Sequence, residues 1–105
     1  MKYDITDLLI FFDEQAPATD EERGYYWFRS KHEKSLVNLI FSVYEETCTI
    51  SVYAQGESVT TSLRFNNCTS INIIDQEKKC LEVLSSGGRC FLSTKDSINV
   101  EYEDK

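Results

Sequence analysis

Short alternations of apolar and polar residues fill this chain from 24 to 102 and constrain its fold more than any other feature. In the segment 47–54, Cys48 and Ile50 alternate with Thr and Ser residues. Side chains of a strand point to its two faces in turn, so this period predicts strands with one buried face. Turn-forming runs such as the Ser-Ser-Gly-Gly at 85–88 separate them, and such short turns join antiparallel neighbours.

We expect seven or eight strands in all, and a mostly antiparallel sheet built from about seven of them. Their approximate ranges are 25–28, 36–44, 47–54, 58–65, 68–74, 80–84, 89–94 and 98–102. Turns are expected at 45–46, 55–57, 66–67, 75–79 and 95–96. The run 36–44 is apolar on both faces, because Leu36 and Ile40 oppose Val37 and Leu39. That pattern is typical of a central strand lying between a second layer and a helix.

One helix is predicted over residues 4–14, before the strands begin. Asp4 is a suitable N-cap, with Asp7 three positions on as in a capping box. Apolar residues at helical spacing predict one stripe, made of Ile5, Leu8, Leu9 and Phe12. Ile10 and Phe11 lie beside it and are expected to be buried, or else to face a partner. Residues 15–23 read as a solvated loop.

The fold class predicted is therefore α+β, with the helix packed on the sheet, which is either open or a partly closed barrel. Residues 1–105 are expected to form a single domain, since 105 residues are one domain's worth.

The charge is concentrated at the two ends of the chain. The formal net charge is −7; residues 1–22 carry seven acids and one Lys, and residues 96–105 carry four acids and one Lys. Such a chain is repelled by phosphate backbones and acidic membranes, so neither nucleic acid nor membrane is expected as a partner. A basic protein partner is favoured, although acidity also serves solubility alone. If both ends lie on one side, they form one negative surface.

We expect a cytoplasmic protein, since no signal peptide or membrane-spanning run is recognisable. Cys48, Cys68, Cys80 and Cys90 are then expected to be reduced, buried thiols. No two of them form a C-x-x-C pair, so no metal and no cofactor is predicted. His32 is the only histidine and lies in a charged turn, which favours a surface role over catalysis.

The aromatic run at 25–28 is followed by Arg29 and could stack on bases, but the net charge opposes nucleic acid. Core packing or a protein interface, where Trp and Tyr are enriched, is the better interpretation. The candidate partner-binding residues are Asp13, Glu14, Asp20, Glu21, Glu22, Tyr25 and Trp27.

Residues 32–102 resemble small immunity proteins of bacterial polymorphic-toxin and contact-dependent inhibition systems. The similarity lies in the succession of strands, in the pattern at 59–68, in Ile71-Asn-Ile73 and in the closing run at 97–103. The resemblance implies a small, acidic, cytosolic, non-enzymatic protein that neutralises a toxin domain by tight binding. It transfers no binding residue, because those surfaces differ between pairs.

Other functions remain open from the sequence. A phage-type inhibitor that mimics nucleic acid would share the acidity, and a β-barrel that binds a small ligand would share the strands. An enzyme would need a pocket lined by His32 and at least two polar partners. The protein is expected to be a monomer or a homodimer, since an edge strand can pair with a second copy.

Overall fold

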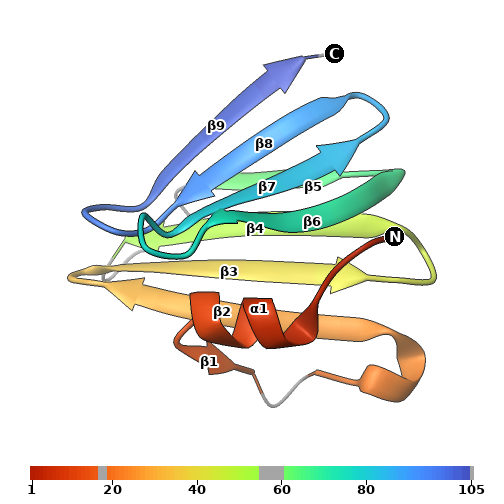
Figure 1. Ribbon diagram of the computed structural model, residues 1–105, viewed down its shortest axis with the longest axis horizontal. Coiled ribbons are helices and arrows are strands. Elements are labelled where there is room, and N and C mark those ends of the chain that lie inside the picture. The colour runs from red at the N-terminus through yellow and green to blue at the C-terminus, as the bar shows by residue number, and fades with distance from the viewer. Residues whose placement is uncertain (17–18, 55–60, 105) are drawn as a thin grey trace.

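The computed structural model describes residues 1–16, 19–54 and 61–104 (Figure 1). Its elements are α1 (Ile5–Phe11), β1 (Glu14–Gln15), the 3₁₀ helix η1 (Glu21–Arg23), β2 (Tyr25–His32), β3 (Ser35–Ser42), β4 (Thr47–Ala54), β5 (Thr61–Phe65), β6 (Cys68–Asp75), β7 (Cys80–Ser85), β8 (Gly88–Ser93) and β9 (Asn99–Asp104). The expected turn at 55–57 and the start of the run at 58–65 fall outside the described residues.

The described strands form two antiparallel sheets in which each strand pairs with its neighbours in the sequence. One sheet has the order β1-β2-β3-β4-β5 and the other β6-β7-β8-β9. The predicted α+β class with open antiparallel sheets is confirmed. Nine strands are described where about seven were expected, and the two-residue β1 is too short to alternate visibly in the sequence.

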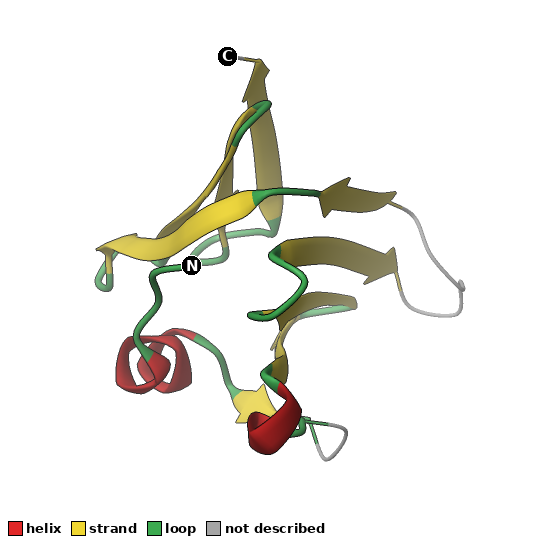
Figure 2. Ribbon diagram, turned by 90° about the vertical axis from the view of Figure 1, so that its right-hand side faces the viewer, coloured by secondary structure: helices red, strands yellow, loops and turns green. Residues whose placement is uncertain are grey.

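The turn at residues 66–67 does not close a hairpin, which corrects the expectation of one continuous meander. Instead, the chain leaves β5 in one sheet and enters β6 in the other, so β5 and β6 do not pair (Figure 2). Asn67 takes the left-handed conformation with φ of 53°. Asn tolerates this conformation better than most residues, and here it lets the chain change sheets.

The hydrophobic core lies between the two sheets and draws on both of them. Its fully buried side chains include Phe28, Phe41 and Ile50 from the first sheet and Leu81 and Leu92 from the second. These residues belong to one cluster with the buried residues of α1. The central strands β2, β3, β4, β7 and β8 each bury alternate residues against this core.

The helix begins at its predicted cap: the Asp4 side chain accepts a hydrogen bond from the Asp7 amide. Leu8, Phe11 and Phe12 are buried, but Leu9 is 47% exposed and Ile10 58% exposed. The predicted burial of Leu9 and Ile10 is therefore wrong, and that of Phe11 is confirmed. The helix docks on β6.

The helix and the four-stranded sheet lie on the same side of the five-stranded sheet (Figure 2). The expectation that the strand at 36–44 lies between a second layer and the helix is therefore wrong. One face of β3 contacts the shared core, and the other face carries Leu36 and Ile40, both partly exposed. This arrangement leaves one face of the larger sheet uncovered by any described element.

The N-terminal residues complete the edge of the smaller sheet. Lys2 forms a parallel bridge with Ser70: the Lys2 amide donates to the Thr69 carbonyl, and the Ile71 amide donates to the Lys2 carbonyl. No helix in the described part of the chain has the length and hydropathy needed to cross a bilayer.

Candidate protein-binding face

The uncovered side of the five-stranded sheet is a surface with apolar side chains that no described element packs against. We call it the open face. The strand register assigns to it Tyr25, Trp27, Arg29, Leu36, Asn38, Ile40, Thr49, Ser51, Tyr53, Ser62 and Arg64, of which Asn38 and Ser51 are buried. Its large apolar side chains are all partly exposed. A partly apolar face with few charges is a surface suited to contact with another macromolecule.

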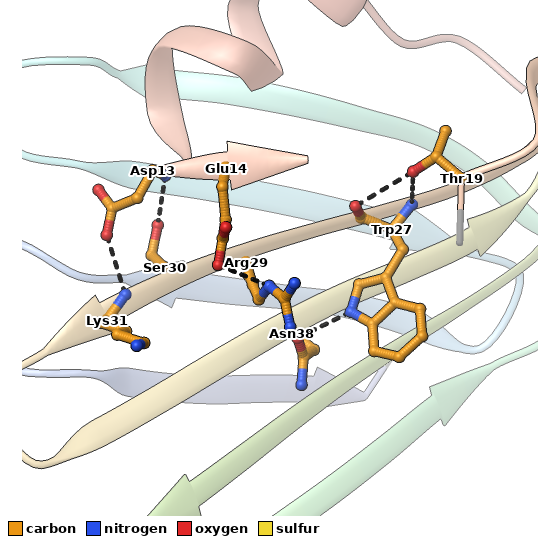
Figure 3. A network of polar contacts seen from close by, with 8 residues as sticks. All are labelled: Asp13, Glu14, Thr19, Trp27, Arg29, Ser30, Lys31 and Asn38. Carbon is orange, nitrogen blue, oxygen red and sulfur yellow. Dashed lines mark hydrogen bonds and ion pairs between the residues drawn. The ribbon is translucent and has the colours of Figure 1, made fainter. Parts of the chain in front are cut away.

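Trp27 is the most firmly held aromatic side chain of the open face (Figure 3). Its indole Nε1 donates to Asn38 Oδ1 at 2.8 Å, and Asn38 is itself buried. Its amide donates to Thr19 Oγ1 at 3.1 Å, and the Thr19 hydroxyl donates to the Trp27 carbonyl at 3.3 Å. A ring fixed in this way loses little further side-chain entropy when it is covered, which suits an interface anchor.

Acids line the β1 side of the open face, and three of them have partners within the chain. Asp13 Oδ2 accepts from the Lys31 amide at 2.9 Å, and Glu14 Oε1 lies 2.6 Å from Arg29 Nε (Figure 3). Asp20 caps η1 through the Arg23 amide and pairs with the Arg23 side chain at 3.5 Å. The carboxylates of Asp13 and Glu14 hold the β1 segment against β2, and that of Asp20 caps η1, so all three are less available to a partner than the sequence suggests.

Glu21 and Glu22 are different, because both are exposed. Among the described residues, neither carboxylate makes an ion pair or a hydrogen bond; only the Glu22 backbone carbonyl accepts, from Tyr44 Oη at 3.4 Å. We call these two residues the acidic margin. A hollow of about 510 Å³ lies on the open face next to η1 and is lined by residues that include Asp20, Arg23, Tyr25 and Ile40.

Some of the candidate partner-binding residues lie close together in the structure, and others lie apart. Asp20 and Tyr25 are bridge partners, so they lie together at the end of β2 nearest Glu21 and Glu22. Glu14 pairs with Arg29 and lies further along β2. Residues that the sequence reading did not propose share this face, namely Leu36, Ile40, Tyr53 and Arg64. The apolar pattern on both faces of the run 36–44 was the signal that could have found two of them.

The acids of the two chain ends do not form one surface. β9, which carries Glu101, Glu103 and Asp104, is the outer strand of one sheet, whereas β1 is the outer strand of the other. Figure 1 places β9 and β1 at opposite edges of the molecule. The idea of a single negative side is therefore wrong, and the molecule carries two separate acidic regions.

His32 is the last residue of β2 and pairs with Ser35, so the predicted turn begins one residue later, at Glu33. It lines a hollow of about 630 Å³ together with Glu33 and Asp96. Its imidazole makes no hydrogen bond to any described residue, and no described group of His, Cys, Asp and Glu could hold a metal ion.

The four cysteines are free, and three of them are buried; Cys80 is half-buried. Donation of a hydrogen bond to Cys68, together with burial, raises the pKa of the Cys48 thiol well above its usual value. Burial also raises the pKa of Cys90 to about 11. The thiolate is the nucleophile, so Cys48 and Cys90 are protonated and inert near neutral pH.

Comparison of this chain with family models, with curated proteins and with solved structures found no match. No relative therefore assigns a role to the open face or to the acidic margin.

Proposed function

We propose that the protein is a non-enzymatic, cytoplasmic inhibitor that binds a basic partner protein, and that this partner is a toxin domain with a nuclease-like cationic cleft. The observation that carries the proposal is the uncovered sheet face bearing Trp27 and Ile40, with the unpaired carboxylates of Glu21 and Glu22 at its margin. The strand pattern shared with small immunity proteins supports the choice of a toxin as partner.

The apolar part of the open face supplies the contact area in this proposal. Trp27 and Ile40 are opposite one another on β2 and β3, and Tyr25 lies two positions from Trp27 on the same face. Trp and Tyr dominate the binding energy of many interfaces when a partner excludes water from around them. Trp27 is the expected centre of the contact because its ring is already fixed by Asn38.

The acidic margin supplies the electrostatic part. Glu21 and Glu22 can approach a cationic cleft without breaking an internal ion pair, unlike Glu14, whose partner is Arg29. Rim charges of this kind mainly accelerate association and make it dependent on salt. A nucleic-acid mimic would instead need acids repeated across one face, and the open face itself carries Arg29 and Arg64.

The proposal predicts that a gene beside this one encodes a toxin domain, and the test is binding to that domain, measured by calorimetry. Trp27→Ala should weaken binding at least about 30-fold, the loss typical of a central anchor. Leu9→Ala is the matched control, because Leu9 is also an exposed apolar residue but lies on α1. Thermal melting of each variant establishes that it is folded. If Trp27→Ala is not folded, Trp27→Phe takes its place in the binding measurement.

The charge contribution is tested separately by Glu21→Lys, with Glu101→Lys as a control of equal charge change at the opposite edge. Glu21→Lys should slow association and reduce its salt dependence, and Glu101→Lys should leave both unchanged. Absence of a complex would contradict the proposal, and so would equal effects of the variants on and off the open face.

A further inference from the structure

β9 is the longest strand edge that the described structure leaves open. It pairs only with β8, and no described segment lies beyond it (Figure 1). The opposite edge of the same sheet, at β6, is covered by the bridge from Lys2 to Ser70. In the other sheet, the edge strand β1 has only two residues, and the edge strand β5 has five. An open edge of six residues offers backbone donors and acceptors to an added strand.

The pairing pattern shows which backbone groups of β9 point outward. Ser85 and Gly88 flank a two-residue turn, and the Thr94 amide donates to the Lys79 carbonyl at 3.0 Å. Because hydrogen-bonded pairs alternate along antiparallel strands, the even-numbered residues of β8 bond to β7 and the odd-numbered ones bond to β9. Glu101 and Glu103, opposite Phe91 and Arg89, are thus the bonded residues of β9.

The N–H and C=O groups of Val100, Tyr102 and Asp104 consequently face away from β8. The side chains alternate in the same way: Val100 and Tyr102 point to the core side, opposite the buried Leu92 and Cys90. The Tyr102 ring stacks on Phe65 with centroids 5.7 Å apart and remains 45% exposed. An incoming strand would therefore meet apolar surface on one of its faces.

The other face of β9 is acidic. Glu101 and Glu103 point to the outer side of the sheet, where Glu103 lies 3.8 Å from Arg89, and Glu101 makes no ion pair among the described residues. A second copy of the chain is a poor occupant, because antiparallel pairing of two β9 strands would set these carboxylates against their own counterparts. Like charges directly opposite one another destabilise a sheet, whereas Lys or Arg there would stabilise it.

We propose that β9 binds an extended, basic segment of another protein, which adds to the smaller sheet as a fifth strand. The segment alternates basic residues, opposite Glu101 and Glu103, with apolar residues that pack on Val100 and Tyr102. This site lies at the opposite edge from the acidic margin and does not depend on the toxin-inhibitor function proposed for the open face.

The probe is a short acetylated peptide in which Lys and Val alternate. In the free protein, the outward amides of Val100, Tyr102 and Asp104 should exchange with solvent quickly, while those of Glu101 and Glu103 are protected by β8. Saturation with the peptide should slow exchange of the outward amides specifically, as followed residue by residue by NMR. A peptide in which Lys and Pro alternate keeps the charge but lacks half of the backbone donors, so it should bind much more weakly.

A matched pair of charge reversals separates strand addition from general attraction to an acidic protein. Glu101→Lys should weaken peptide binding about fivefold or more, since an attractive cross-strand pair becomes repulsive. Glu21→Lys changes the net charge equally at the other edge and should have little effect. Glu101→Gln replaces the reversal if the Lys variant does not fold, with an effect in the same direction.

The proposal is overturned if the Lys-Val peptide does not bind or if it protects amides outside β9. It is equally overturned if both charge reversals weaken binding alike, or if the Lys-Pro peptide binds as well as the Lys-Val peptide. A concentration-dependent dimer whose formation protects the β9 amides would show that the occupant is a second copy instead.

Discussion

At the scale of single residues, Tyr26 is a phenol held in the core by aromatic neighbours. Its ring lies 5.0 Å from that of Phe41 and 5.6 Å from that of Tyr3, measured between centroids. The pKa of Tyr26 is raised to about 12, mainly by burial of the phenol and to a smaller extent by a hydrogen bond with Tyr3. Near neutral pH the phenol is protonated in the folded and unfolded states alike, so its titration affects stability only in alkali.

We predict that Tyr26 contributes to alkaline unfolding. Above the ordinary pKa of 10.0, the unfolded state loses the phenolic proton while the folded state keeps it, so the free energy of unfolding falls as the pH rises toward 12. The stability of Tyr26→Phe should fall less steeply between pH 10 and pH 12. Urea titrations at a series of pH values measure this, and parallel curves for the two proteins would contradict it.

The sequence shows which residues are acidic or aromatic, but it does not show which residues of the chain they contact. Asp13 and Glu14 read as free surface charges, yet they bind the Lys31 amide and the Arg29 side chain. Those contacts depend on the register of β1 against β2, which brings together residues about fifteen positions apart. Glu21 has no such partner, and only the tertiary structure distinguishes it from Glu14.

At the scale of elements, α1 is a case in which hydrophobic periodicity did not predict which apolar side chains are buried. Five of its seven residues are apolar, so several stripes fit the spacing equally well. The place where the helix docks determines which stripe is buried. α1 contacts β6. At the C-terminal end of α1, Lys79 Nζ donates hydrogen bonds to the carbonyls of Ile10 and Phe11. That docking turns Leu8 inward and Leu9 outward.

We predict that two neighbouring leucines of α1 differ sharply in their contribution to stability. Leu8→Ala should lower the free energy of unfolding by about 3 kcal/mol, because Leu8 is fully buried and the change leaves a cavity. Leu9→Ala should lower it by less than about 1 kcal/mol, since Leu9 is largely exposed. Urea denaturation measures both, and similar losses would show that the helix is oriented differently.

Most of the strands were predictable in position because they alternate apolar with polar residues; β1, with two residues, was not. What the alternation could not show is which strands pair across a turn. The turn at 66–67 looks like a hairpin turn, but it joins β5 in one sheet to β6 in the other. Adjacent strands of a hairpin and strands of two packed sheets bury the same kind of residues, so composition does not separate the two cases.

At the scale of the whole molecule, the two sheets share one core and should unfold together. Leu81 on β7 and Phe28 on β2 are both fully buried members of the same cluster. Small domains with one core usually unfold in a single cooperative transition.

We predict that a cavity in the smaller sheet destabilises the larger one equally. Leu81→Ala should lower stability by about 3 kcal/mol and shift the unfolding midpoint seen by Trp27 fluorescence as far as that seen by circular dichroism. Leu84→Ala, on the outer face of the same strand, should have a smaller effect. Separate midpoints for the two probes would show that the sheets unfold independently.

The bridge between Lys2 and Ser70 has a consequence for the order of folding. Each sheet consists of hairpins between neighbours in the sequence, and contacts of that kind close short loops at small entropic cost. The bridge, like the bond from Gln76 to the Asp7 carbonyl, joins residues nearly seventy positions apart. Since α1 contacts β6, we expect the helix to dock only after β6 has formed, although α1 precedes every strand in the sequence.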